Sequence, residues 1–485
     1  MTVSATDVET VIAPMSDFMI GVKGNDLAPR IIEKWELSPD GTAWIFHIRK
    51  GIKWHNGEEL TAKDLKFSLE QYAAPTAFTN FLRTYLNGVV DIVDDYTVRA
   101  FTKGPQPYVP WVISIGAGNQ GFIAPKDYYE KNGKDYYEQH PIGNGPFKVV
   151  RRVASDLIEY EAVANHWRIV PDFKKVTLIL IPEQTTRMAM LKTGAVDLID
   201  VGVEDAIEAE KAGFRSAQLS VGADCLELFG TYGPEKDKIP TGDIRVRQAL
   251  SLAINRDEIR QSLMYGKAGP PGPAFYTYDA ADVDVDYWKS YLAKAYRYDP
   301  TEAKRLLKEA GYADGFPIKI WSFTQAGSPH LPKVAQVIQA YWRAVGVKAE
   351  IYPVDFSVFT ATRAGGPNRE PKPEIVGQAS LSTFSQSPIA ATKMEAGFRS
   401  KGTWGLLSTA KPEVDALLTQ VGSELNDAKR REALAKVTQL IVDSYAGFEI
   451  MTTPVMAAFG PRIDVAFPSG TLAIPMYLDL VKHKK

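Results

Sequence analysis

The segment from Thr241 to Pro273 constrains the fold most, because it predicts two short helices and a rigid loop around which the chain divides. Apolar residues recur there at helical spacing and predict one buried face: Val246, Ala249, Leu250, Ala253 and Ile254. The polar residues between them are expected on the solvent side: Arg245, Arg247, Gln248 and Ser251. Asp243 and Asn255 are placed to cap the two helices. The Gly and Pro residues of 266–273 then force a loop, so the segment predicts a helical hairpin packed on a core.

The size and charge of the chain limit its class. With 485 residues it exceeds the size at which one hydrophobic core usually keeps growing, so two or three domains are expected. Its hydrophobic content of 45% and charged content of 24% are ordinary for globular proteins. A net charge of −2 predicts no basic surface for nucleic acid or anionic lipid.

The apolar runs of the sequence are too short for a membrane span, which needs about 18 residues. The longest, VTLILI at 176–181, predicts a buried strand. The first residues, MTVSATDVET, have neither the basic nor the apolar part of a signal peptide. Either the protein is cytoplasmic or a signal peptide has been removed from it.

Cysteine and histidine usage bears on metal sites and disulfides. The single cysteine, Cys225, excludes an intrachain disulfide and a multi-thiolate metal site, and we expect it buried in a strand. The six histidines are scattered along the chain: His47, His55, His140, His166, His330 and His483. No metal site formed by the protein itself is therefore expected, although a metal carried by an organic chelator would need no such cluster.

Helices and strands alternate through the chain, which predicts an α/β or α+β plan with several sheets. The residues 35–48 predict a hairpin around a Pro-Asp-Gly turn. Thr61 and Asp64 resemble a capping box at the start of a helix. The glycine-rich turn IGNGPF at 142–147 leads into a strand, and Asp299 and Pro300 mark another helix start.

Motifs of the common nucleotide-binding and catalytic folds are not convincing. Residues 116–121 fit G-x-G-x-x-G, but a dinucleotide fold needs a long helix directly after it, and Pro125 interrupts. There is no P-loop, no H-E-x-x-H and no G-x-S-x-G sequence. No nucleophile–base pair is visible, so we expect neither an enzyme nor a bound cofactor.

Four blocks carry a resemblance to a known family: 27–70 (LAPRIIEKWELSPDGTAWIF and onward), 141–150 (PIGNGPFKVV), 243–259 (DIRVRQALSLAINRDEI) together with 298–312 (YDPTEAKRLLKEAGY), and 411–444. In this order the chain resembles the family 5 extracellular solute-binding proteins. These are the receptors of oligopeptide, dipeptide and nickel ABC importers. The resemblance covers nearly the whole chain.

The resemblance implies an α/β, periplasmic-binding-protein type II-like bilobal fold with mixed sheets, in which two hinged lobes close over solute and an extra domain is inserted. The implied lobe I comprises 1–18, 143–243 and 453–485. The inserted domain II comprises 19–142, and lobe II comprises 244–452. The implied partners are a small-molecule or peptide-like ligand and the permease subunits of an ABC importer. A monomer at the periplasmic or outer face of the membrane is implied, with membrane contact only through the transporter or a lost lipid anchor.

The resemblance also nominates site residues. In peptide-binding members a segment of lobe II supplies the carboxylate that pairs with the peptide α-amine. The matching segment here, 374–388, has no Asp, and Phe384 falls near the expected position. Arg363 matches an arginine that some members direct at the ligand. Trp404 is expected to stack on the ligand. In the inserted domain, Phe81 or Tyr85 matches an aromatic residue that lines the cleft.

A cationic amine closed into a cleft without a counter-charge costs several kcal/mol. The missing carboxylate therefore predicts a neutral or anionic solute that lacks a free α-amine. A conventional peptide or metal-chelate binder stays open as an alternative. So do an enzyme on the same fold and a receptor that serves a sensor.

Overall fold

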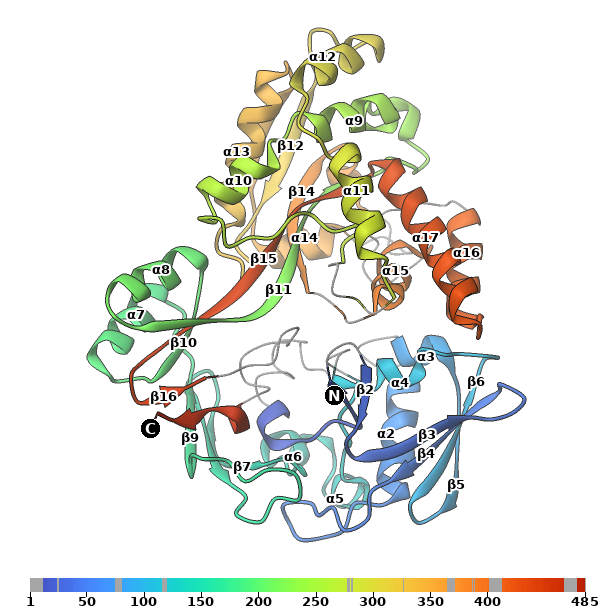
Figure 1. Ribbon diagram of the computed structural model, residues 1–485, viewed down its shortest axis with the longest axis vertical. Helices are drawn as coiled ribbons and strands as arrows, with labels where there is room; N and C mark the ends of the chain where they lie inside the picture. The colour runs from blue at the N-terminus through green and yellow to red at the C-terminus, as the bar shows by residue number, and fades with distance from the viewer. Residues whose placement is uncertain are drawn as a thin grey trace. The chain divides into compact units, whose positions relative to one another are not determined.

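The computed structural model describes residues 12–23, 26–74, 81–115, 120–276, 280, 282–325, 327–363, 371–385, 387, 389–400, 412–465 and 478–484. The chain divides into two compact units (Figure 1). The first unit comprises 1–201, 205–220 and 456–485, and the second comprises 202–204 and 221–455. The strands β11 (Arg215–Leu228) and β15 (Gly447–Phe459) each begin in one unit and end in the other.

The first unit contains a four-stranded antiparallel sheet in the order β3-β4-β6-β5. Its strands are β3 (Ile32–Leu37), β4 (Ala43–Ile48), β5 (Leu86–Asp94) and β6 (Thr97–Thr102). The predicted hairpin is confirmed, since Trp35 pairs with Phe46 and Leu37 with Trp44. Helix α2 (Ala62–Ala73) packs on β5 and β6, and the predicted capping box of Thr61 and Asp64 starts it. Apolar side chains from residues 19–123 form one core here.

A second sheet of the first unit has the order β7-β8-β9, and it has its own core with residues of the C-terminal region such as Phe459 and Ile463. The remaining strands of this unit are β1 (Ile20–Lys23), β2 (Asp26–Pro29), β7 (Phe147–Val153), β8 (Leu157–Ala162), β9 (Lys175–Ile179), β10 (Leu198–Val201), β16 (Ile463–Asp464) and β17 (Lys482–His483). Its other helices are α3 (Phe81–Tyr85), α4 (Val109–Val112), α5 (Lys126–Asn132), α6 (Lys134–Gln139), α7 (Gln184–Thr193) and most of α8 (Val203–Lys211).

The second unit is built on the strands β15-β11-β14-β12-β13, with β12 parallel to both β13 and β14. Its further strands are β12 (Pro317–Ser322), β13 (Lys348–Pro353) and β14 (Ala379–Ser385). Its helices are α9 (Ile244–Leu252), α10 (Arg256–Ser262), α11 (Val285–Ala295), α12 (Pro300–Glu309), α13 (Leu331–Ala344), α14 (Phe356–Arg363), α15 (Ala390–Phe398), α16 (Pro412–Ser423) and α17 (Asp427–Ser444). Helix α13 covers β12, β13 and β14. None of the helices in the described part of the chain is both long and apolar enough to cross a membrane.

Three predicted helix caps of the second unit are confirmed. The side chains of Asp243, Asn255 and Asp299 accept backbone N–H groups at the starts of α9, α10 and α12. Cys225 is buried in β11, as predicted. These features depend on neighbours a few residues away, so the local sequence is sufficient to predict them.

Two predictions about exposure are wrong. Arg247 and Ser251 were expected in solvent but are buried, because α9 is enclosed on more than its apolar face. The Arg247 guanidinium donates to the carbonyl oxygens of Thr241, Gly242 and Ser444, which satisfies these N–H donors inside the core. The run at 176–181 is not a buried strand, since β9 lies at the edge of the sheet β7-β8-β9 and Leu180 is 61% exposed.

Candidate functional site

The pairing of β11 with β14 brings the predicted ligand-facing segment onto a polar face of the second unit. Glu227 lies opposite Ser380, and Cys225 lies opposite Ser382. Because side chains alternate along a strand, Phe384 follows on the same face as the two serines. Arg363, the last residue of α14, extends its guanidinium to this face, with Nη1 3.6 Å from Glu227 Oε2.

Glu227 is a fully buried carboxylate that several polar groups of the protein contact. The hydroxyls of Ser380 and Ser382 each donate to its Oε2 over 3.2 Å. Burial raises the pKa of Glu227 above its usual 4.5, and Arg363 with the two serine hydroxyls offsets part of that rise. Among the described residues, no group hydrogen-bonds to Oε1 of Glu227 or to Nε of Arg363.

The structure brings two of the predicted site residues together. The ring centroid of Phe384 lies 6.0 Å from Cζ of Arg363. Phe384 is 7% exposed and stacks on Phe275, with centroids 5.2 Å apart and planes 2° from parallel. The arginine and the aromatic ring therefore form one surface, at the distance of a cation–π contact.

The other predicted site residues lie in the first unit or outside the described residues. Tyr85 belongs to the first unit, where it is 4% exposed and part of the core. The backbone of Phe81 lies in α3, but its side chain is outside the described residues, as is all of Trp404. Contact of these three residues with solute stays a prediction.

Two further carboxylates near β14 are already satisfied. Asp224 accepts hydrogen bonds from the hydroxyls of Thr383 and Thr453 at 2.6 Å each, and its Oδ2 lies 2.7 Å from His330 Nε2. Asp282 accepts the backbone N–H groups of Ala390 and Ala391 at the start of α15. Each carboxylate is therefore engaged by the protein itself.

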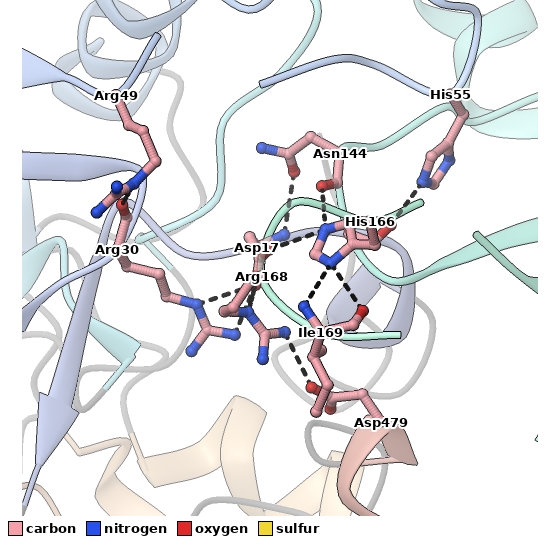
Figure 2. Close-up of polar contacts among 10 residues, drawn as sticks. Asp17, Arg30, Arg49, His55, Asn144, His166, Arg168, Ile169 and Asp479 are labelled. Atoms are coloured by element: carbon pink, nitrogen blue, oxygen red, sulfur yellow. Dashed lines mark hydrogen bonds and ion pairs between the residues drawn. The ribbon is translucent and has the colours of Figure 1, made fainter. Parts of the chain in front are cut away.

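The first unit contains a charged cluster that the sequence did not suggest: Asp17, Arg30, His166, Arg168 and Asp479 (Figure 2). Asp17 is fully buried, and its Oδ1 accepts hydrogen bonds from Arg30 Nε at 2.9 Å, Arg30 Nη2 at 2.6 Å and Arg168 Nε at 2.9 Å. Arg168 Nη2 also donates to Asp479 Oδ2 at 2.9 Å. His166 Nε2 lies 3.2 Å from the second Asp17 oxygen.

Electrostatics keep Asp17 ionised. Burial alone would raise its pKa, but Arg30, His166 and Arg168 outweigh burial and hold the pKa far below the usual 3.8. The cluster therefore contains two carboxylates matched by two guanidiniums, as a buried charge requires.

The glycine-rich turn of the sequence supports this cluster. The backbone N–H of Asp17 donates to Asn144 Oδ1, and a Cβ on Gly143 would lie 1.9 Å from the carbonyl oxygen of Met15. His55 holds the turn, since Gly143 N–H donates to its Nδ1 and its Nε2 lies 3.0 Å from Gly145 O. Burial lowers the pKa of His55 to about 4, which keeps the ring neutral. The turn was the one sequence signal that pointed to this region.

Comparisons with known proteins agree on the family. The sequence profile of bacterial extracellular solute-binding proteins, family 5 (middle region), matches residues 26–370. Heme-binding protein A of Haemophilus influenzae is 27% identical, over 90% of this chain and 81% of that protein. The dipeptide-binding protein of Escherichia coli is 29% identical, over 71% of this chain and 66% of that protein. The glutathione-binding protein GsiB of Shigella dysenteriae is 26% identical, over 85% of this chain and 78% of that protein.

Solved structures share the fold. The ABC transporter substrate-binding protein CtaP of Listeria monocytogenes superposes with a TM-score of 0.83 at 18% identity, covering 100% of this chain and 96% of that one. The periplasmic binding protein DppA of Helicobacter pylori gives 0.78 at 21% identity, covering 100% and 95%. The α/β fold is thus that of periplasmic binding proteins, as predicted, and the relatives are named as binding proteins and not as enzymes. The chain belongs to the bacterial extracellular solute-binding proteins of family 5.

Proposed function

We propose that this protein is the extracytoplasmic receptor of an ABC importer, which captures a small organic or peptide-like solute and passes it unaltered to the permease subunits. Membership of family 5 supports this role. So do relatives named for binding heme, a dipeptide and glutathione. We further propose that it acts as a monomer at the outer face of the membrane. In this proposal, lobe I and the inserted domain divide the first unit near residues 18 and 142, which the separate cores of its two larger sheets support.

We infer that the solute lacks a free α-amine and is neutral or anionic. The supporting observation is the pairing of Glu227: the buried carboxylate nearest to Arg363 is already occupied by that guanidinium and two serine hydroxyls. Asp224 and Asp282 are engaged as well. Although Oε1 of Glu227 has no partner among the described residues, its carboxylate charge is already paired with Arg363, so an added ammonium group would have to share that counter-charge.

In this proposal Arg363 and Phe384 contact the solute in the second unit, and Trp404, Tyr85 and Phe81 add aromatic surface. The Nε nitrogen of Arg363, which has no partner in the described part of the chain, is the donor for a carboxylate or carbonyl oxygen. Phe384 supplies an aromatic ring beside it. A planar guanidinium next to a ring suits a flat, oxygen-bearing group.

The test is calorimetry with pairs of free and N-acetylated dipeptides, after native mass spectrometry of the purified protein for co-purified solute. We expect acetylation to leave binding unchanged or to improve it. Tight binding that depends on the free amine would contradict the inferred solute.

Arg363→Gln sharpens the test. We expect it to weaken binding of the best N-acetylated compound about tenfold, because it removes one charge-assisted hydrogen bond. Arg297→Gln is the matched control, since Arg297 is an exposed arginine of the same unit whose ion partner, Asp299, lies 3.6 Å away. Equal affinities of the two variants would exclude Arg363 from the site.

A conventional peptide receptor is the second candidate, and one observation favours it: Oε1 of Glu227 is a buried acceptor with no partner among the described residues. If a peptide amine binds, Glu227 is then its counter-charge. Glu227→Gln would abolish amine-dependent binding in that case and would leave binding of acetylated compounds unchanged.

A further inference from the structure

Arg30 and Arg168 lie side by side in the first unit, held by one carboxylate. Figure 2 shows both guanidiniums directed at Asp17, each with one terminal nitrogen on the side away from it. Nε and Nη2 of both arginines have carboxylate partners, whereas neither Nη1 contacts a hydrogen-bond acceptor within the described ranges. The side chains keep 15% and 24% of their surface exposed, so both can be reached from solvent.

The protein fixes both arginines before any ligand arrives. Three N–H groups converge on Asp17 Oδ1, and Asp479 holds the other side of Arg168. Cζ of Arg30 lies 5.8 Å from the ring centroid of Phe18. Since neither side chain has to be ordered on binding, the usual entropy cost of engaging a long side chain is already met.

We propose that Arg30 and Arg168 form a binding site for an oxyanion, a carboxylate or a phosphate, which accepts one hydrogen bond from each Nη1. Two guanidinium donors side by side match the geometry of such groups. The formal charges of Arg30 and Arg168 are cancelled by Asp17 and Asp479, so the site selects by the direction of its donors and not by net charge. A free ion therefore binds less tightly here than an anionic group attached to a larger molecule, which gains further affinity elsewhere.

If the oxyanion belongs to the transported solute, the solute carries an anionic group. That conclusion rests on the proposed function. The site itself exists or fails independently of import. An experiment with simple ions therefore tests it without the solute.

The experiment is an NMR titration of the whole protein carrying ¹⁵N-arginine, with sodium acetate and with sodium phosphate at constant ionic strength. Arg30→Lys, Arg168→Lys and Arg49→Lys each remove one Nε–H signal and so assign the three. Arg49 is the control, because it lies nearby but pairs weakly with Glu33, at 3.9 Å, and covers the Trp167 ring. We expect saturable shifts of the Arg30 and Arg168 signals and none for Arg49.

The two ions distinguish the source of the oxyanion. Saturation with acetate supports a carboxylate, and saturation with phosphate alone supports a phosphate ester. In Arg30→Lys, which keeps the charge but loses the planar fork, the remaining Arg168 signal should require about tenfold more ion. The proposal is overturned if neither ion saturates the two signals, if Arg49 shifts equally, or if Arg30→Lys titrates like the natural protein. Those outcomes leave the calorimetric test of solute binding untouched.

Discussion

Asp17 in the first unit and Glu449 in the second are both completely buried carboxyl groups, but their surroundings shift their pKa values in opposite directions. Two guanidiniums contact Asp17, and they hold its pKa far below the usual value in spite of burial. Burial raises the pKa of Glu449 well above 4.5, with the backbone N–H of Gly272 among the few groups that lower it.

An arginine is close to Glu449 as well, which makes the comparison informative. Arg256 donates to the carbonyl oxygens of Glu449, Ser251 and Tyr296 and to the Ser251 hydroxyl, and none of these hydrogen bonds goes to the carboxyl group of Glu449. Burial alone therefore does not decide the direction in which the pKa of an acidic residue shifts. The direction also depends on whether a nearby cation contacts the carboxylate itself.

Asp17→Asn should have the largest effect. It leaves two partly buried guanidiniums without their shared counter-charge, so we expect the free energy of unfolding at pH 7 to fall by about 3–5 kcal/mol. Urea denaturation measures it, with the exposed Asp156→Asn as the control. A loss below about 1 kcal/mol would mean that Asp17 contributes no more than a surface ion pair.

The same variant also checks the sign of the pH dependence. Because the pKa of Asp17 is lower in the folded state than in the unfolded state, its contribution is present above about pH 4 and is lost as the pH falls through the folded value. The stability difference between the natural protein and Asp17→Asn should therefore shrink below about pH 4. A difference that stays constant down to pH 3 would contradict an ionised Asp17.

Gly143→Ala should come next, and it tests the turn behind the cluster. Its Cβ would lie 1.9 Å from the backbone oxygen of Met15, so the chain must shift, and we expect a loss of about 3 kcal/mol in thermal or urea unfolding. Gly460→Ala is the control in the same unit, since its nearest contact is 3.7 Å away. If both variants lose the same stability, close approach of the turn to residues 15–17 is not what requires glycine.

At pH 4, Glu449→Gln should have the smallest effect of the three variants, because the amide resembles the neutral acid that burial favours. At pH 4 we expect a change below about 1 kcal/mol. The raised pKa means that the natural protein loses stability as the pH rises above about 4.5, so the variant should become relatively more stable by up to about 1.4 kcal/mol for each pH unit. A variant that is instead destabilised as the pH rises would show that Glu449 is ionised in the folded state.

Much of the fold follows from local sequence. The caps at Asp243, Asn255 and Asp299 depend on residues up to three positions away, and the hairpin of β3 and β4 depends on a turn between alternating residues. Such signals fail where burial depends on distant neighbours. The apolar run that includes Leu180 lies at the edge of a sheet, and Arg247 points into a core made by α9 and the end of α17.

The sequence by itself therefore determined the order of elements, the helix starts, the family and the absence of an acidic residue at 379–385. Only the tertiary structure decided which charges meet. It pairs Asp17 with an arginine 151 positions away, which in turn pairs with an aspartate 311 positions further on. It also places Arg363 against Glu227 and Phe384. The reason is physical. A helix cap forms between residues within one turn, whereas the pKa of a buried group depends on contacts with residues that are distant in the sequence and meet only when the chain folds.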